Sequence, residues 1–310
     1  MGILLALIAG IFMPLTNLTV RKGVDAGGNA KGYFVFQSIS SLLFALLIGP
    51  VWTGDFSPSL PAAILGISAG LILSLMLYSL GKAVEKGPPG FTFAILNSAT
   101  VTPGLLMAIL FGAAMGYEYN FYHGAGSILV IGGLFWAGKG LQGLKDRNQW
   151  ILFSLAMFAM HALLLALYQW RGFLLKPERP AGIFPFFSID SVKSECFAPF
   201  MFLTSGLIQI SIYFRSKTSK PKAGEIAYGF IGGLSNSLCT FFLLAAAEKA
   251  SALEHAMIFP IFSVVGIILT NAWGQKLYQE QVNWRACQMC AFGLIVGTVD
   301  WKAVAAAIGF

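Results

Sequence analysis

One histidine stands well inside a predicted helix, in the apolar run ILFSLAMFAMHALLLALYQW. An ionisable side chain within hydrocarbon is costly and usually faces a cavity or a partner. Imidazole also gains and loses a proton near neutral pH. His161 is therefore a candidate proton-coupling or substrate-contacting residue. The alternative is a neutral histidine that is hydrogen-bonded within a helix bundle.

Neutral polar side chains recur along the apolar runs and supply the donors and acceptors that can replace water around a polyol. Asn17 follows Pro14 in IFMPLTNLTV, and a helix broken in this way is typical of transporter sites near the membrane midplane. Ser and Thr can instead bond back to their own helix, and Asn17 can join two helices. The predicted substrate-binding residues are Asn17, Ser74, Tyr78, Asn97, Thr100, His161, Asn236, Thr240 and Ser263.

The sequence has no metal-ligand cluster, no paired carboxylates within an apolar run, no phosphate-binding loop and no nucleophile–base set. Hydrolysis and ATP-driven pumping therefore have no visible machinery. Cys287 and Cys290 have redox spacing but lie in an apolar run, which favours structural packing. We expect no enzymatic activity, no metal and no cofactor.

The composition indicates that these residues are placed by membrane helices. Charged residues make up 11% of the 310 residues and hydrophobic residues 57%, and the mean hydropathy is +0.75. Soluble domains carry about 25% charged residues, so we expect an integral membrane protein in a lipid bilayer. The net charge of +7 lies in short loops, where it orients the chain, so no nucleic-acid partner is expected.

A helix needs about 20 apolar residues to cross the hydrocarbon, and backbone groups in lipid must be satisfied within the segment. The predicted fold is therefore all-α, with ten transmembrane helices. Their predicted ranges are 2–20, 32–51, 61–81, 91–114, 124–138, 150–170, 198–214, 225–247, 254–273 and 285–305. The proline-containing connection 171–197 separates five helices from five, which predicts halves at 1–149 and 150–310.

A repeat relates the two halves. Residues 66–86 match 229–249 at nine of 21 positions without a gap. The matches include the Gly-xxx-Gly spacing and a terminal Glu-Lys pair. Five helices per half is an odd number, so matching helices must cross in opposite directions, and the repeat is inverted. The glycines are expected to pack helices within one chain, with a homodimer contact as the alternative.

The repeated Glu-Lys pairs end the third and eighth predicted helices, on opposite faces of the membrane. Each pair is a candidate for holding one gate shut while its own side is closed. The alternative is that both are charged helix ends that reach into water. The gating candidates are Glu85, Lys86, Glu248 and Lys249.

The distribution of basic residues predicts the orientation. Odd-numbered loops hold 13 Lys and Arg and even-numbered loops hold five, while the loops TGDFSPSL and GYEYNFYHG hold none. Basic loops face the cytoplasm, so both termini are predicted to lie outside.

At this level the chain resembles the drug/metabolite transporter superfamily, of the EamA-like type. The resemblance rests on the two inverted halves, the glycine-rich third and eighth helices, and the segments FTFAILNSATVTPGLLMAI and EHAMIFPIFSVVGIIL. The basic loop lies between helices 1 and 2 instead of 2 and 3. In this the chain is more similar to the rhamnose–proton symporter and glucose-uptake branch than to the amino-acid exporters.

That resemblance implies a secondary transporter with alternating access. We expect proton-coupled uptake of a small neutral polar metabolite, with a sugar as the first choice, across the inner membrane of a bacterium. The scarcity of cations in the helices argues against phosphorylated substrates. Alternatives are an amino-acid or drug exporter of the same superfamily and a non-transporting membrane protein such as a lipid scramblase. A monomer and a homodimer both fit the sequence.

Overall fold

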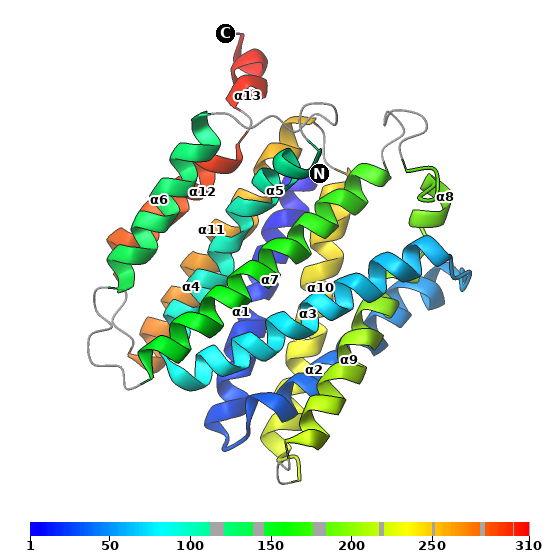
Figure 1. The fold of residues 1–310 in the computed structure, drawn as a ribbon, viewed down its shortest axis with the longest axis vertical. Coiled ribbons are helices and arrows are strands. Elements are labelled where there is room, and N and C mark those ends of the chain that lie inside the picture. Colours follow the sequence, from blue (N-terminus) through cyan, green and yellow to red (C-terminus); the bar gives the residue numbers. More distant parts are fainter. Residues whose placement is uncertain are drawn as a thin grey trace.

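The computed structural model describes residues 1–111, 121–138, 146–175, 184–216, 220–249, 252–279, 283–299 and 301–309. Within these ranges the chain forms a bundle of helices and contains no strand (Figure 1). Parts of the predicted GYEYNFYHG loop and of the 171–197 connection lie outside the described residues. The helices are α1 (Gly2–Asp25), α2 (Ala30–Leu46), the π-helix η1 (Leu47–Val51), α3 (Leu60–Lys86), α4 (Pro89–Ser98), the 3₁₀ helix η2 (Ala99–Val101), α5 (Thr102–Phe111), α6 (Phe121–Gly138), α7 (Arg147–Leu174), α8 (Ile189–Val192), α9 (Phe197–Arg215), α10 (Ala223–Lys249), α11 (Ala252–Tyr278), α12 (Trp284–Thr298) and α13 (Trp301–Ile308).

Six of these segments are long and apolar enough to cross a membrane. They are Gly2–Asp25, Ala30–Val51, Leu60–Lys86, Arg147–Leu174, Phe197–Arg215 and Ala223–Lys249. Each coincides with one of the predicted apolar runs. The chain is therefore an all-helical, multi-pass membrane protein.

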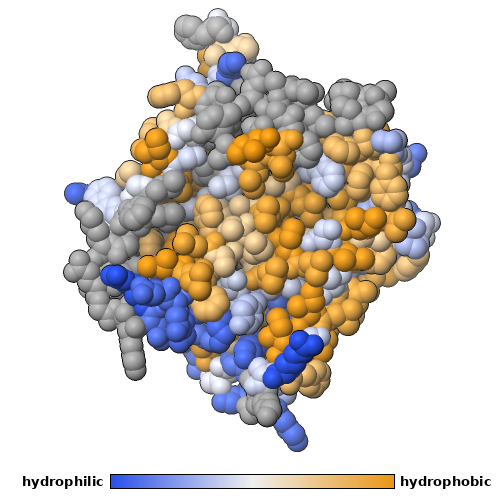
Figure 2. Space-filling model, in the orientation of Figure 1, coloured by the Kyte–Doolittle hydropathy of each residue, from blue (hydrophilic) through white to orange (hydrophobic). Residues whose placement is uncertain are grey.

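The spanning helices carry apolar side chains on both faces, as helices in lipid do. On α3, Ile64, Leu71 and Leu75 are exposed, whereas Gly66 and Gly70 are buried. Figure 2 shows hydrophobic residues over much of the middle of one face of the molecule. Such a surface has no favourable contact with water and is suited to lipid.

Local signals set where the helices begin. The Asn29 side chain accepts a hydrogen bond from the Gly32 N–H (2.9 Å) and starts α2. The Ser59 hydroxyl accepts one from the Ala62 N–H (3.1 Å) and starts α3, with Pro61 in the first turn. These caps satisfy backbone donors that have no partner in the helix.

The two glycines of α3 allow close contact with α9. A Cβ atom on Gly66 would lie 2.7 Å from the Cβ of Phe200, and one on Gly70 would lie 2.6 Å from the Cβ of Thr204. Real Cβ atoms do not approach so closely, so only glycine permits this spacing. These glycines pack helices within one chain, as the sequence predicts.

The matching glycines of α10 make the same contacts with α2. A Cβ on Gly229 would lie 2.7 Å from the Cβ of Phe36, and one on Gly233 would lie 2.6 Å from the Cβ of Ser40. Phe36 and Ser40 stand 164 residues before Phe200 and Thr204. One packing geometry therefore occurs twice in the chain.

The buried faces of α1 and α7 also match. The buried residues Ala6, Ala9, Met13 and Val20 stand 148 positions before Ser154, Met157, His161 and Tyr168, which are buried as well. Helix contacts follow the same pairing, because α1 packs on α10 and α11 while α7 packs on α3, α4 and α5. At one edge of the bundle α6 lies beside α12 (Figure 1).

One apolar run is interrupted near its middle. Helix α4 ends at Ser98, a 3₁₀ turn covers Ala99–Val101, and α5 continues from Thr102 with Pro103 in its first turn. Such turns free backbone carbonyls from the regular helix ladder. The interruption lies beside the cavity described next.

Candidate functional site

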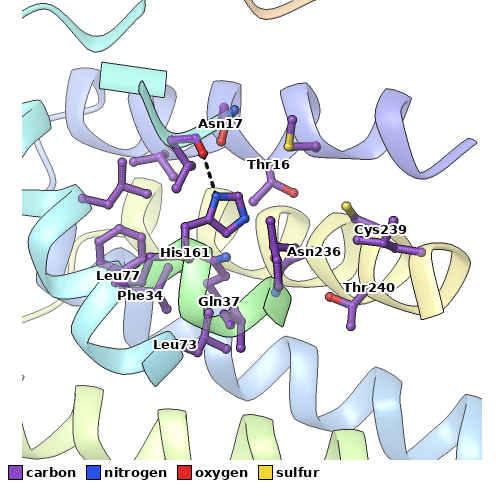
Figure 3. A pocket seen from close by; sticks show the side chains of 18 of the residues that line it. Thr16, Asn17, Phe34, Gln37, Leu73, Leu77, His161, Asn236, Cys239 and Thr240 are labelled. Carbon is purple, nitrogen blue, oxygen red and sulfur yellow. Dashed lines mark hydrogen bonds between the residues drawn. The ribbon is translucent and has the colours of Figure 1, made fainter. Parts of the chain in front are cut away.

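A cavity of about 90 Å³ lies in the centre of the bundle, among α1, α2, α3, α4, α7, α9, α10 and α11 (Figure 3). A buried water needs roughly 10–15 Å³ on this measure, so the cavity has room for several waters. Most of its wall is apolar. Its polar side chains are Thr16, Asn17, Gln37, His161, Tyr168, Asn236 and Thr240.

Four of the nine predicted substrate-binding residues line this cavity. Asn17 comes from α1, His161 from α7, and Asn236 and Thr240 from α10 (Figure 3). No charged side chain is among the described residues that form the wall. The site can therefore solvate a neutral polar group but has no counter-charge for a phosphate or a carboxylate.

His161 is held by a backbone bond. Its Nδ1 lies 2.7 Å from the carbonyl oxygen of Leu96, near the end of α4, as the dashed line in Figure 3 marks. A carbonyl only accepts, so Nδ1 carries the proton. Nε2 is then the ring nitrogen that can take up or release a second proton. The bond also fixes the imidazole against the wall of the cavity.

Two amides of the wall have unused hydrogen-bonding atoms. Asn17 is 4% exposed and its Nδ2 has no partner, and Gln37 is 2% exposed and its Oε1 has none, among the described residues. Each unsatisfied group costs about 1–3 kcal/mol when buried. A donor and an acceptor on two residues that line the cavity thus lack a partner among the described residues.

The sequence prediction omitted three polar residues of the wall, Thr16, Gln37 and Tyr168. Gln37 is an amide within the apolar run KGYFVFQSISSLL, which is a signal of the same kind that identified Asn17. Tyr168 donates from its hydroxyl to the sulfur of Met201 (3.1 Å). It lies seven residues after His161, two turns farther along the same face of α7.

The other five predicted residues lie outside this cavity. The Ser74 hydroxyl donates to the Gly70 carbonyl of its own helix (2.8 Å). Tyr78 is 38% exposed and packs edge-to-face on Phe153. Ser74 therefore follows the alternative in which a hydroxyl bonds back to its own helix. Tyr78 faces the outside of the bundle.

Thr100 and Ser263 contact one another at the interruption of α4. The Ser263 hydroxyl donates to the Thr100 hydroxyl (2.7 Å), which donates to the Asn97 carbonyl (3.0 Å). Asn97 is fully buried, and both polar atoms of its side chain lack a partner among the described residues. The hydrogen bond between Thr100 and Ser263 thus joins η2 to α11.

A second cavity of about 30 Å³ shares Asn17 with the first. Its wall includes Pro14, Arg21 and Tyr278. The Arg21 guanidinium lies 4.8 Å from the centre of the Tyr278 ring and forms an ion pair with Asp25 (3.1 Å). Asn17 therefore stands between the central cavity and the end of α1.

The four gating candidates differ in their contacts. Glu85 pairs with Lys82 of its own helix (2.7 Å), and Lys86 reaches Asp146 before α7 (3.0 Å). Glu248 pairs with Arg171, so it joins α10 to α7 (3.0 Å). Lys249 is exposed. In the pair that ends α3, the lysine therefore contacts another segment. In the pair that ends α10, the glutamate does so.

Comparisons with known proteins bear on the fold alone. No protein-family model matches the chain, and no curated protein matches it. Twenty-one chains of solved structures match. One is a crystal structure whose description names no function, with a TM-score of 0.66 and 13% sequence identity, covering 96% of each chain. The whole arrangement of helices therefore recurs in a protein of similar length.

Fold and site together define the class. The chain is an all-helical, multi-pass membrane protein. Its helices enclose a central cavity with a neutral, partly polar wall.

Proposed function

We propose that this protein is a secondary transporter of the drug/metabolite transporter superfamily. It has ten transmembrane helices in two inverted halves and moves a small neutral polar metabolite by alternating access. The observation that carries the proposal is the central cavity, with the unused donor of Asn17 and the unused acceptor of Gln37 on an uncharged wall. A sugar presents many hydroxyl groups, each of which donates and accepts, and it needs no counter-charge.

The inverted repeat is supported by the doubled glycine packing of α3 on α9 and α10 on α2. It is also supported by the matching buried faces of α1 and α7. Two halves that pack in the same way can exchange conformations across the membrane, which is the basis of alternating access.

Proton coupling is supported by His161, whose Nδ1 is fixed by Leu96 while the ring lines the cavity. Ligand sites typically occupy about 300–1,000 Å³, so the observed cavity of about 90 Å³ corresponds to a closed form. Binding requires the helices to separate on one side. We place the protein in the bacterial inner membrane with both termini outside, and we assign it no enzymatic activity.

The test is uptake into proteoliposomes of a panel of labelled neutral sugars, with and without an inward proton gradient. Accumulation of one sugar above its outside concentration, only with the gradient, is the expected result. Accumulation of amino acids instead, or release against a gradient, favours the exporter. Gradient-independent lipid movement without solute uptake favours a scramblase.

The candidate sugar is chosen beforehand by thermal stabilisation in detergent, because a ligand that binds the folded state raises its stability by mass action. Orientation is tested separately, with single cysteines placed in 52–60 and in 139–149. An impermeant thiol reagent should label the first only from outside and the second only from the cytoplasm.

A further inference from the structure

The second cavity reaches from the wall of the central cavity to one end of the bundle. Asn17 of α1 lines both cavities. The second cavity is also lined by Pro89, the first residue of α4, and by Tyr278, the last residue of α11. Arg21, which lines it too, stands four residues before the end of α1. The second cavity therefore lies between the central cavity and the end that holds the 26–29 turn, which connects α1 to α2.

The long direction of the second cavity follows the helices. Asn17 and Arg21 of α1 line it, four residues apart. Thr270, Gly274 and Tyr278 of α11 line it at the same spacing. Residues four apart are neighbours on one face of a helix, so each helix presents successive turns to the cavity. The space is therefore a lengthwise gap between α1, α4 and α11.

The wall of the second cavity carries two buried polar groups without partners among the described residues. Thr270 is 8% exposed and its Oγ1 has no hydrogen-bond partner, and the same holds for the Nδ2 of Asn17. Buried polar groups in folded proteins usually have partners. Their absence here favours a region that takes up water in another conformation. A volume of about 30 Å³ holds about two waters, so a solute passes only when the helices separate.

An aromatic contact joins two of these helices at the end of the second cavity. The Arg21 guanidinium lies 4.8 Å from the centre of the Tyr278 ring, and the Lys22 ammonium lies 5.6 Å from it. The ion pair of Arg21 with Asp25 stays within α1, whereas the contact with the ring connects α1 to α11. The Arg21 side chain is 30% exposed. A cation–ring contact at a partly exposed site is weak, so it can break and re-form as the helices move.

We propose that the second cavity is the passage through which a solute moves between the central cavity and the solution at the end that holds the 26–29 turn. Arg21 and Tyr278 close this passage. It opens when the guanidinium leaves the ring and α1 separates from α11. The distribution of basic residues predicts that this end is the cytoplasmic one. The inference rests on the proposed function in treating the central cavity as the site of a moving solute.

A cysteine of the chain can report on the passage. Cys239 lines the central cavity, and the chain has four cysteines. A protein with the substitutions Cys196→Ser, Cys287→Ala and Cys290→Ala keeps Cys239 alone. An impermeant thiol reagent is applied to the outside of membrane vesicles of either orientation. The rate at which Cys239 is labelled from each side of the membrane is then measured by mass spectrometry.

The first variant obstructs the passage. Thr270→Phe places a large side chain in the wall of the second cavity. Labelling of Cys239 from the side that holds the 26–29 turn should be lost, and labelling from the other side should stay as in the parent protein. The matched control is Ile268→Phe, which adds a ring to the same helix at a position that is 47% exposed and does not line the second cavity. It should leave both rates unchanged.

The second pair of variants removes the closing contact. Tyr278→Leu eliminates the aromatic ring, whereas Tyr278→Phe keeps the ring and removes only the hydroxyl. Labelling of Cys239 from the 26–29 side should rise about two- to fivefold in Tyr278→Leu, the change in the open population that loss of an exposed cation–ring contact produces. Tyr278→Phe should label at the parent rate.

Labelling from the 26–29 side that survives in Thr270→Phe overturns the proposal. So does an equal loss from both sides, or the same loss in Ile268→Phe, because the effect would then not come from obstruction of this passage. An unchanged rate in Tyr278→Leu removes the closing role of the ring. Should Thr270→Phe fail to fold, the comparison of Tyr278→Leu with Tyr278→Phe decides alone. The labelling needs no substrate, so failure here rejects this passage without rejecting transport.

Discussion

The two halves of the molecule agree in their packing and differ in their charges. Gly70 and Gly233 make matching contacts with α9 and α2. In contrast, Arg171 of α7 stands where the matched face of α1 has Gly23, and Glu248 pairs between helices where Glu85 pairs within its own. Symmetry is kept where backbones must approach closely, and it is lost where ionisable side chains act. The charged contacts at the ends of α3 and α10 therefore differ although the glycine packing matches.

The largest expected effect comes from another unmatched pair, Met13 in α1 and His161 in α7. His161→Gln should abolish pH-driven accumulation but keep substrate exchange, because exchange moves no net protons. The matched control is Met13→Leu, which should keep both activities. Both are measured in proteoliposomes loaded with the sugar that stabilises the protein. Accumulation that survives in His161→Gln would make His161 a packing residue and remove the functional difference between the two helices.

The next effect tests the agreement between the halves. In Gly70→Ala the new Cβ would lie 2.6 Å from the Thr204 Cβ, and in Gly233→Ala it would lie 2.6 Å from the Ser40 Cβ. Each substitution should lower stability by a similar amount, about 1–3 kcal/mol. Thermal unfolding in detergent is the measurement. Gly172→Ala is the control, since no atom outside its own stretch of α7 lies within 4 Å of its Cβ position. Unequal losses from the two glycine substitutions would break the packing symmetry.

The smallest effects concern the two glutamates. Glu248→Gln weakens a link between helices, whereas Glu85→Gln removes an exposed pair within one helix, worth about 0–1 kcal/mol. We expect Glu248→Gln to raise the rate at which an impermeant thiol reagent labels Cys239, which lines the cavity, when the reagent is applied to the side of the membrane that holds residues 52–59. Glu85→Gln should leave labelling from either side nearly unchanged. Equal and opposite changes in the two variants would mean that both ends are gated alike, contrary to the contacts seen here.

Much of the architecture follows from the sequence. The apolar runs form helices because lipid offers the backbone no other hydrogen-bonding partner. The glycine spacing indicated close packing but did not identify which helix lies against the glycines. The cavity was harder to predict, because the direction in which a side chain points depends on how its helix is rotated against its neighbours. Asn17 and Gln37 are amides in similar runs, and the prediction included only the first.

The burial of Arg171 could not be predicted from the sequence either. By position it counts among the loop cations that orient the chain, yet the structure buries it in the last turn of α7. A charge at the end of an apolar run can lie in water or beneath a covering segment. The choice here depends on α8 and its Val192 carbonyl, which come from a separate part of the chain.

The hydrogen bond between Thr100 and Ser263 joins residues that are 163 positions apart, the spacing of the repeat itself. A hydrogen bond between two matching hydroxyls cannot be symmetric, since one oxygen must give its hydrogen and the other must receive it. Here Ser263 gives to Thr100, and Thr100 gives to Asn97. Reversing the direction requires only that two O–H bonds rotate, with no heavy atom displaced. The contact between η2 and α11 can therefore exist in two hydrogen-bonding directions with the same positions of all heavy atoms.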